Sequence, residues 1–135
     1  MVADVRDLVP RGKHDVDRAR AAVEAGYPAV GPILGELIEW LQDYNWPVAY
    51  VLEPFLRSIG EPLVPHIWHV LRSDDEIWKY WVISLLITGL PPQVAAEFRP
   101  ELERLAYEPT ERERREELDE QARDALDAFG WTRPS

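Results

Sequence analysis

Apolar residues recur along most of the chain at the spacing of an α-helix, and the longest apolar run covers residues 77–90. Apart from one lysine, this run is apolar around nearly the whole circumference of a helix, which predicts a central helix buried on all sides. Ser73 and Glu76 have the spacing of a capping box, and Gly89 supplies a stop signal. The run is too short to span a bilayer, which needs about 20 apolar residues. We therefore expect the other helices to pack around it in one domain.

The same spacing predicts helices on both sides of this run. They are expected over residues 14–25, 27–42, 47–59, 61–71, 92–107 and 110–129. Asp15 is a predicted N-cap, and Thr110 with Glu113 forms a second predicted capping box. Pro54 is predicted to kink its helix, and Pro100 to kink or divide the helical stretch that contains it.

No segment alternates polar and apolar residues as a strand does, so the predicted fold class is all-α. Pro32, Pro65 and Pro100 begin similar segments that lie 33 and 35 residues apart, a spacing typical of helical repeats. We predict a short α-α superhelix of about three helix pairs plus a terminal helix. It forms one domain over residues 1–135, with flexible ends at residues 1–12 and 131–135.

The acidic net charge of the chain makes some classes of binding partner less favourable than others. The formal net charge is −10, and the acidic excess lies in residues 36–76 and 108–135. Binding to a phosphate backbone depends on Lys and Arg, so this distribution disfavours nucleic acid. A basic protein, a basic peptide or a cation fits better, although acidity can also serve solubility alone.

The sequence offers no recognised catalytic or cofactor motif. There is no cysteine, which excludes disulfides and thiolate chemistry. Neither an export signal nor a membrane span is found, so we expect a cytoplasmic protein with no membrane partner. We also find no phosphate-binding loop, dinucleotide fingerprint or nucleophile elbow, and we predict no cofactor.

Two acidic, aromatic turns form the best candidate surface for a partner. Equivalent turns of stacked helix pairs lie side by side, and carboxylates beside aromatic rings suit a basic or Arg-rich ligand. In the alternative, the aspartates are N-caps, the tryptophans are core and the lysine pairs with a neighbouring carboxylate. The candidate partner-binding residues are Asp43, Tyr44, Asn45, Trp46, Asp74, Asp75, Trp78 and Lys79.

Three weaker candidates complete the set. His66 and His69 have a spacing that could present both to a metal, but such pairs are common without one, and we predict no metal site. Lys13-His14-Asp15 resembles a base with its orienting acid, yet no nucleophile motif accompanies it and helix capping explains it better. The alternative function is a small-ligand site or enzyme with an aromatic pocket near Trp46, Trp78 and Trp81.

Two strings in the sequence carry a resemblance to a known family, namely Trp40-Leu41-Gln42-Asp43-Tyr44-Asn45-Trp46-Pro47-Val48-Ala49 and Asp74-Asp75-Glu76-Ile77-Trp78-Lys79-Tyr80-Trp81. The family that they resemble is a small bacterial one defined by a domain of unknown function, DUF5071. Lys13-His14-Asp15 and Val64-Pro65-His66-Ile67 extend the resemblance, which runs from about residue 7 to residue 128. More broadly, the chain resembles HEAT-like α-helical repeats. The resemblance implies a HEAT-like helical fold and no particular activity. Asp74, Asp75 and Lys79 fit the general HEAT pattern loosely, whereas the turn at Asp43 lacks the matching basic residue.

Together these observations predict a non-enzymatic protein-interaction module that binds a basic protein or peptide. A small, acidic protein without catalytic motifs could be an immunity or antitoxin protein that neutralises a basic toxin by charge complementarity. The stripe of the last helix can pack within the chain or against a second copy. We therefore expect a monomer or a weak homodimer.

Overall fold

The structure, a computed structural model, describes residues 4–131. Within this range the chain forms helices joined by turns, without any strand, which confirms the all-α prediction. The α-helices are α1 (Val16–Ala25), α2 (Leu34–Glu39), α3 (Pro47–Ile59), α4 (Val64–Leu71), α5 (Glu76–Leu85), α6 (Pro92–Ala95), α7 (Arg99–Tyr107), α8 (Glu111–Arg115) and α9 (Leu118–Ala128). Short 3₁₀ helices adjoin them: η1 (Val5–Leu8), η2 (Gly31–Ile33), η3 (Trp40–Gln42), η4 (Glu61–Leu63), η5 (Ile87–Gly89) and η6 (Ala96–Phe98).

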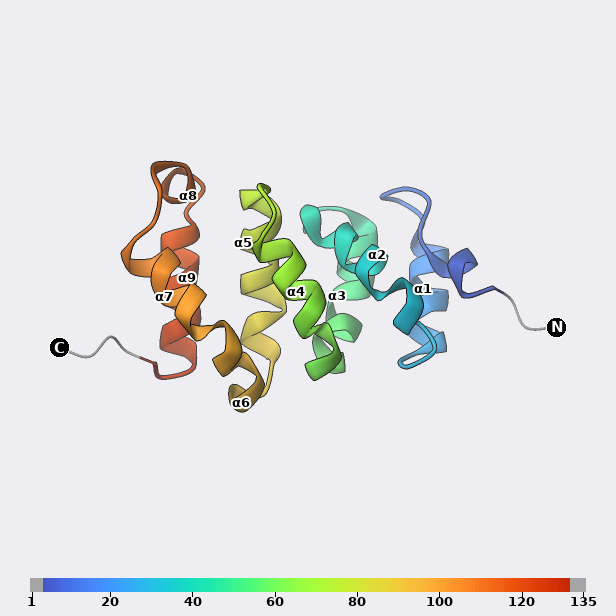
Figure 1. Ribbon diagram of the computed structural model, residues 1–135. Coiled ribbons are helices and arrows are strands. Elements are labelled where there is room, and N and C mark those ends of the chain that lie inside the picture. The colour runs from blue at the N-terminus through green and yellow to red at the C-terminus, as the bar shows by residue number, and fades with distance from the viewer. Residues whose placement is uncertain (1–3, 132–135) are drawn as a thin grey trace.

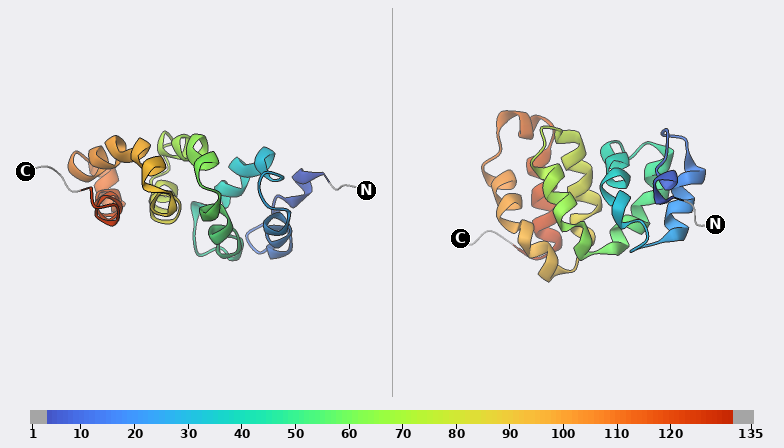
Figure 2. Two further views of the ribbon diagram at one scale, coloured as in Figure 1. Left: turned by 90° about the horizontal axis from the view of Figure 1, so that it is seen from below. Right: turned by 45° about the vertical axis from the view of Figure 1, so that its right-hand side comes forward.

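The helices form two layers along an elongated molecule, with the N- and C-terminal helices at opposite ends (Figure 1). One layer contains α2, α4, α6 and α7, and the other contains α1, α3, α5 and α9 (Figure 2, left). Contacts join α4 to α5 and α7 to α9 between the layers, and α1 to α3 and α5 to α9 within one layer. Buried apolar side chains from both layers form one core.

The three spaced prolines occupy equivalent places in one layer. Pro32 lies in η2 just before α2, Pro65 in the first turn of α4 and Pro100 in the first turn of α7. A proline is tolerated there because the first helical N–H groups have no partner within the helix. This placement agrees with the predicted internal similarity, while the HEAT-like identity of the units remains a prediction.

Several helix ends are where the sequence predicts them. Asp15 caps α1, accepting hydrogen bonds from the backbone N–H groups of Arg11 and Arg18 at 2.9 and 3.4 Å. These bonds hold the pKa of Asp15 below its ordinary value, and the bond from Arg11 has the largest effect. Gly26 follows α1 and Gly60 follows α3, both at positive φ, where a side chain would be strained. Pro54 lies inside α3 as predicted, and Pro100 divides its stretch into separate helices.

The helix predicted over residues 27–42 is wrong at its N-terminal end. Residues 26–31 form a turn instead, in which Val30 N–H donates to Gly26 O and Gly31 N–H to Pro28 O. Pro32 explains the late start, because a proline inside a helix removes a hydrogen bond and its ring clashes with the preceding turn. The α-helical part of this stretch is therefore limited to α2, with a 3₁₀ helix on either side.

The single helix predicted over residues 110–129 is also wrong, because it is broken between α8 and α9. Glu117 lies at the break with φ 62 and ψ 24, a left-handed conformation that interrupts the helical hydrogen bonds. The predicted capping box of Thr110 and Glu113 is nevertheless present at the start of α8. The break turns α8 out of line with α9.

The prediction that residues 77–90 are buried on all sides holds for only part of the helix. Val82, Ile83 and Leu86 are fully buried, but Ile77 is 53% exposed. The buried side of α5 faces α9, α4 and η3, and these elements leave the Ile77 side uncovered. Packing in the core therefore does not explain why an isoleucine occupies this position near the start of the helix.

Parts of the predicted flexible ends lie outside the described residues, namely residues 1–3 and 132–135. The described part of the N-terminal end contains η1, where Arg6 Nη1 lies 3.0 Å from Glu36 Oε1. At the other end, the Trp131 ring stacks on Phe129 with centroids 4.5 Å apart, and the Arg99 guanidinium lies 5.5 Å from the Trp131 ring. The described parts of both ends thus contact the helices. Among the described residues, no helix has both the length and the apolar character needed to cross a membrane.

Candidate protein-interaction surface

The start of α5 is capped by Asp75. Its Oδ1 accepts a hydrogen bond from Trp78 N at 3.0 Å, so this carboxylate satisfies a free N–H of the first helical turn. Ser73 does not form the predicted capping box. Its hydroxyl accepts a bond from Asp75 N at 3.3 Å and donates one to Val70 O at 2.6 Å. The alternative role predicted for Asp75, that of an N-cap, is confirmed.

A buried ionic group lies directly behind this cap. Glu76 and Lys79 are only 8% and 7% exposed, with Lys79 Nζ 4.0 Å from Glu76 Oε1. Arg112 Nε lies 3.0 Å from Glu76 Oε2, and Arg112 Nη2 donates to Asp74 O at 3.0 Å. Burial of a charge is costly unless it is paired, and here one carboxylate is paired with two cations. Lys79 is therefore buried and pairs with Glu76 instead of facing a partner.

Arg112 was not among the predicted site residues. It belongs to α8, which the Thr110–Glu113 capping box begins and the left-handed Glu117 ends. The capping box is visible in the sequence, but the break at Glu117 is not. Arg112 is the arginine of α8 that contacts Glu76 at the start of α5.

Trp78 is a core residue. It is 7% exposed, and its indole Nε1 donates to Ile38 O in α2 at 3.2 Å. The ring thus links α5 to the other layer, in agreement with the alternative role as core. Trp78 also lines the surface cavity described next.

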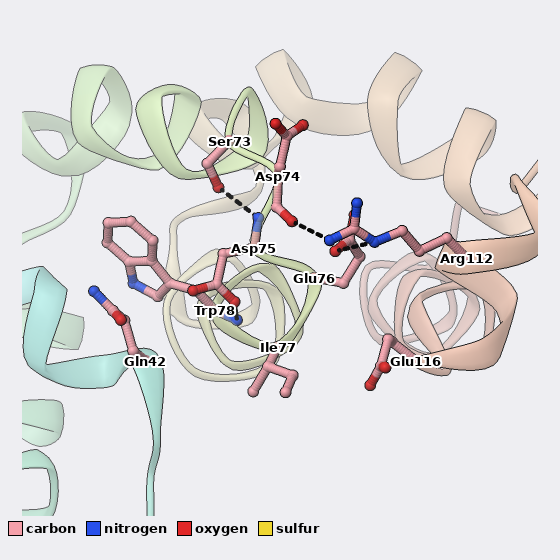
Figure 3. Close-up of a pocket in the computed structure, with 9 residues that line it drawn as sticks. All are labelled: Gln42, Ser73, Asp74, Asp75, Glu76, Ile77, Trp78, Arg112 and Glu116. Atoms are coloured by element: carbon pink, nitrogen blue, oxygen red, sulfur yellow. Dashed lines mark hydrogen bonds and ion pairs between the residues drawn. The ribbon is translucent and has the colours of Figure 1, made fainter.

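A cavity of about 550 Å³ lies over the start of α5, between η3 and α8 (Figure 3). Asp74, Ile77, Arg112 and Glu116 are its exposed residues, and we call these four the α5 cap surface. In Figure 3 the carboxylate of Asp74 points away from Arg112, whereas its backbone oxygen points toward it. The cavity is lined by Gln42, Ser73, Asp74, Asp75, Glu76, Ile77, Trp78, Arg112 and Glu116.

The first predicted turn has a compact local structure. Asp43 Oδ1 accepts a hydrogen bond from Asn45 N at 2.8 Å, and Asp43 O accepts one from Trp46 N at 3.1 Å. Trp46 packs edge-on against Trp40, with ring centroids 5.7 Å apart. Asp43 therefore shapes the turn that places Pro47 at the start of α3, and Asn45 is exposed at its tip.

The two predicted turns do lie beside each other, through Tyr44 and Gln42. The Tyr44 ring lies 5.6 Å from that of Trp81 in α5 and 4.7 Å from that of Tyr50 in α3. Burial, with a smaller contribution from Glu53, raises the pKa of Tyr44 above its ordinary value. Gln42 lines the same cavity as Asp74. Trp46 does not reach this cavity.

The three tryptophans named for an aromatic pocket, Trp46, Trp78 and Trp81, have different surroundings. Trp46 lines a cavity together with Trp40, and Trp78 lines the cavity at the start of α5, which shares Gln42 with the first. Trp81 packs against Tyr80, with ring centroids 5.0 Å apart. These tryptophans have different neighbours, and a small-ligand site near them stays a prediction.

His66 and His69 line a cavity between α2 and α4 together with Glu36 and Glu39. Within residues 4–131, no group of three or more His, Asp or Glu side chains is arranged to hold a metal ion. Burial, followed by the neighbouring His69, lowers the pKa of His66 below its ordinary value, so its imidazole is neutral at pH 7.

Comparison with known proteins gives a family but no activity. No curated protein matches the chain. A family model described as a domain of unknown function (DUF5071) matches residues 8–126, which is most of the chain. The protein is therefore a member of the DUF5071 family.

Proposed function

We propose that this protein is a protein-interaction module that binds a basic protein or peptide at the α5 cap surface. The observation that carries the proposal is the charge of the cavity. Four carboxylates line it, those of Asp74, Asp75, Glu76 and Glu116, whereas the nearby cations, Arg112 and the buried Lys79, are both paired with Glu76. Such a surface attracts Lys and Arg and repels other acidic molecules. The HEAT-like architecture and the cytoplasmic location predicted from the sequence remain part of the proposal.

Arg112 supports the proposal because it shows how a cation is accommodated there. Its guanidinium binds one carboxylate oxygen and one backbone oxygen at 3.0 Å each, while its side chain remains 66% exposed. Guanidinium groups are suited to such paired acceptors. A partner arginine would meet similar acceptors nearby in the carboxylates of Asp74 and Glu116, which form no ion pair within the described residues.

Ile77 supplies the apolar part of the surface. Interfaces are commonly organised around an apolar anchor surrounded by polar groups, and single charges at a rim contribute little. Ile77 is 53% exposed on an otherwise well-packed helix and lines the same cavity as the carboxylates. A partner with an apolar residue next to a basic one would use both features.

Reversing two exposed carboxylates should abolish capture of the partner. Asp74 and Glu116 are suitable because neither is a helix N-cap, whereas reversing Asp75 would also damage α5. We expect the Asp74→Lys, Glu116→Lys variant to retain the basic partner from a lysate of the source organism at least about tenfold less than the native chain.

The matched control reverses Asp124 and Asp127, two exposed carboxylates of α9, and so makes the same change in net charge. It should retain the partner as the native chain does. Equal retention by all three proteins, or no basic protein retained by any of them, would contradict the proposal.

A further inference from the structure

Further cavities continue from the α5 cap surface across the layer formed by α2, α4 and α6. A cavity of about 420 Å³ beside η3 shares Gln42 with the cavity at the start of α5. It shares Glu36 and Glu39 with a cavity between α2 and α4. That cavity in turn shares Pro65 with one of about 770 Å³ at the start of α4 and α6. Consecutive cavities thus adjoin at shared residues, and we call the three that follow the α5 cap surface the α2/α4 groove.

The α2/α4 groove is lined from α4 by Val64, Pro65, His66 and His69, and the α5 cap surface lies beyond the C-terminal end of this helix. Glu61 precedes α4 and Asp74 follows it, and α4 itself has eight residues, which makes it about 12 Å long. Figure 1 shows α2 and α4 next to each other on the near side of the molecule, and contacts between these helices agree. An extended polypeptide of about twelve residues has a reach of roughly 40 Å, which exceeds the length of α4.

The groove has the same sign of charge as the α5 cap surface. Its carboxylates are Glu36, Glu39, Glu61 and Glu97, and within residues 4–131 neither Lys nor Arg is among its lining residues. Glu39 and Glu61 are exposed and form no ion pair in that range. A charged groove of this kind is complementary to a polypeptide that carries Lys or Arg at intervals.

Two contacts already show cation and N–H recognition by these carboxylates. Arg6 Nη1 lies 3.0 Å from Glu36 Oε1, and Trp68 Nε1 donates to Glu97 Oε2 at 3.0 Å. Apolar residues lie between the carboxylates, with Pro65 on two of the cavities and Tyr27, 46% exposed, at the α6 end, beside the polar side chains of His66, His69 and Gln93. The apolar residues and the carboxylates together suit the stems and charged ends of long basic side chains.

We propose that the partner binds as an extended basic segment that runs from the α5 cap surface along the α2/α4 groove to the start of α6. This inference rests on the proposed function and adds the conformation and the path of the partner. The occupant is a flexible, basic polypeptide that contributes several cations along its length.

The test uses fluorescence polarisation with a labelled peptide of about twelve residues, made of four Arg-Gly-Ser repeats, and a single Arg-Gly-Ser unit for comparison. The assay is run at about pH 7.5, where the lowered pKa of His66 leaves its imidazole without a positive charge that would oppose the peptide. We expect the long peptide to bind and the Glu39→Lys, Glu61→Lys variant to bind it at least about fivefold more weakly. The Asp124→Lys, Asp127→Lys control has the same net charge and should bind like the native chain.

The outcomes separate this inference from the proposed function. If the Asp74→Lys, Glu116→Lys variant loses affinity while the Glu39→Lys, Glu61→Lys variant matches the control, the extended path is overturned and the α5 cap surface stands. Equal binding of the short and long peptides overturns the extended path as well. If all three double variants weaken binding alike, the attraction is non-specific and both proposals fail.

Discussion

The Trp78→Ala variant is expected to lose about 3–5 kcal/mol of its free energy of unfolding, the range found when a buried aromatic side chain is truncated. Trp78 is 7% exposed, and its indole joins α5 to Ile38 in α2. The substitution removes this interlayer contact and leaves a cavity. Because small domains have a free energy of unfolding of about 5–15 kcal/mol, the loss would be a large part of the total. Urea denaturation followed by circular dichroism measures it.

Trp78→Phe is the control that keeps an aromatic ring and removes the indole N–H. It should cost less, about 1–3 kcal/mol for the hydrogen bond and the smaller ring. A loss below about 1 kcal/mol for the alanine variant would contradict the placement of Trp78 in the core, since a surface tryptophan can be removed at little cost.

The second large effect is expected at Glu113, where Glu113→Gln should lower the free energy of unfolding at pH 7 by about 1–3 kcal/mol. Glu113 is 6% exposed, and its carboxylate accepts bonds from Arg104 Nη2 at 2.7 Å and from Thr110 N at 2.8 Å. Glutamine keeps an oxygen for Thr110 N but removes the charge that pairs with Arg104. The exposed Glu111→Gln variant in the same helix is the control and should change little.

This effect depends on pH in a defined direction. The hydrogen bond from Arg104, the largest cause, lowers the pKa of Glu113 below its ordinary value of 4.5. A carboxylate with a depressed pKa in the folded state stabilises the protein fully above its unfolded-state pKa and loses that contribution as the pH falls through the folded-state pKa. The difference between native and Glu113→Gln should therefore be largest at neutral pH and shrink below pH 4.5. A difference that stays constant across this range would contradict the ion pair.

Helix ends that depend on local chemistry could be predicted from the sequence. Asp15 before α1, Pro47 at the start of α3 and Gly60 after it are recognised because capping and turn formation involve residues close in sequence. The predicted helices extend across Pro32 and Glu117 for different reasons. The apolar spacing continues through Pro32 although the proline spacing places the beginning of a segment there, whereas glutamate is not a residue type that favours the left-handed conformation of Glu117.

The candidate site could be predicted only in part. The sequence indicated two neighbouring acidic turns, and Gln42 and Tyr44 do lie against α5. It could not show that Lys79 is buried or that Arg112 reaches Glu76 from α8, because both depend on contacts between distant segments. A partner can therefore reach fewer residues than the two predicted turns contain. It also meets the guanidinium of Arg112, which lies outside these turns.

The central claim, that the α5 cap surface binds a basic segment, is tested most directly by removing its own cation. The measurement is the affinity of the peptide of four Arg-Gly-Ser repeats for the native chain and for the Arg112→Gln and Arg114→Gln variants. Both substitutions lie in α8 and remove one positive charge, but only Arg112 lines the cavity. The account predicts that Arg112→Gln strengthens binding by about threefold or more relative to Arg114→Gln, because it frees carboxylate for the peptide. Equal affinities, or weaker binding by Arg112→Gln, would contradict it.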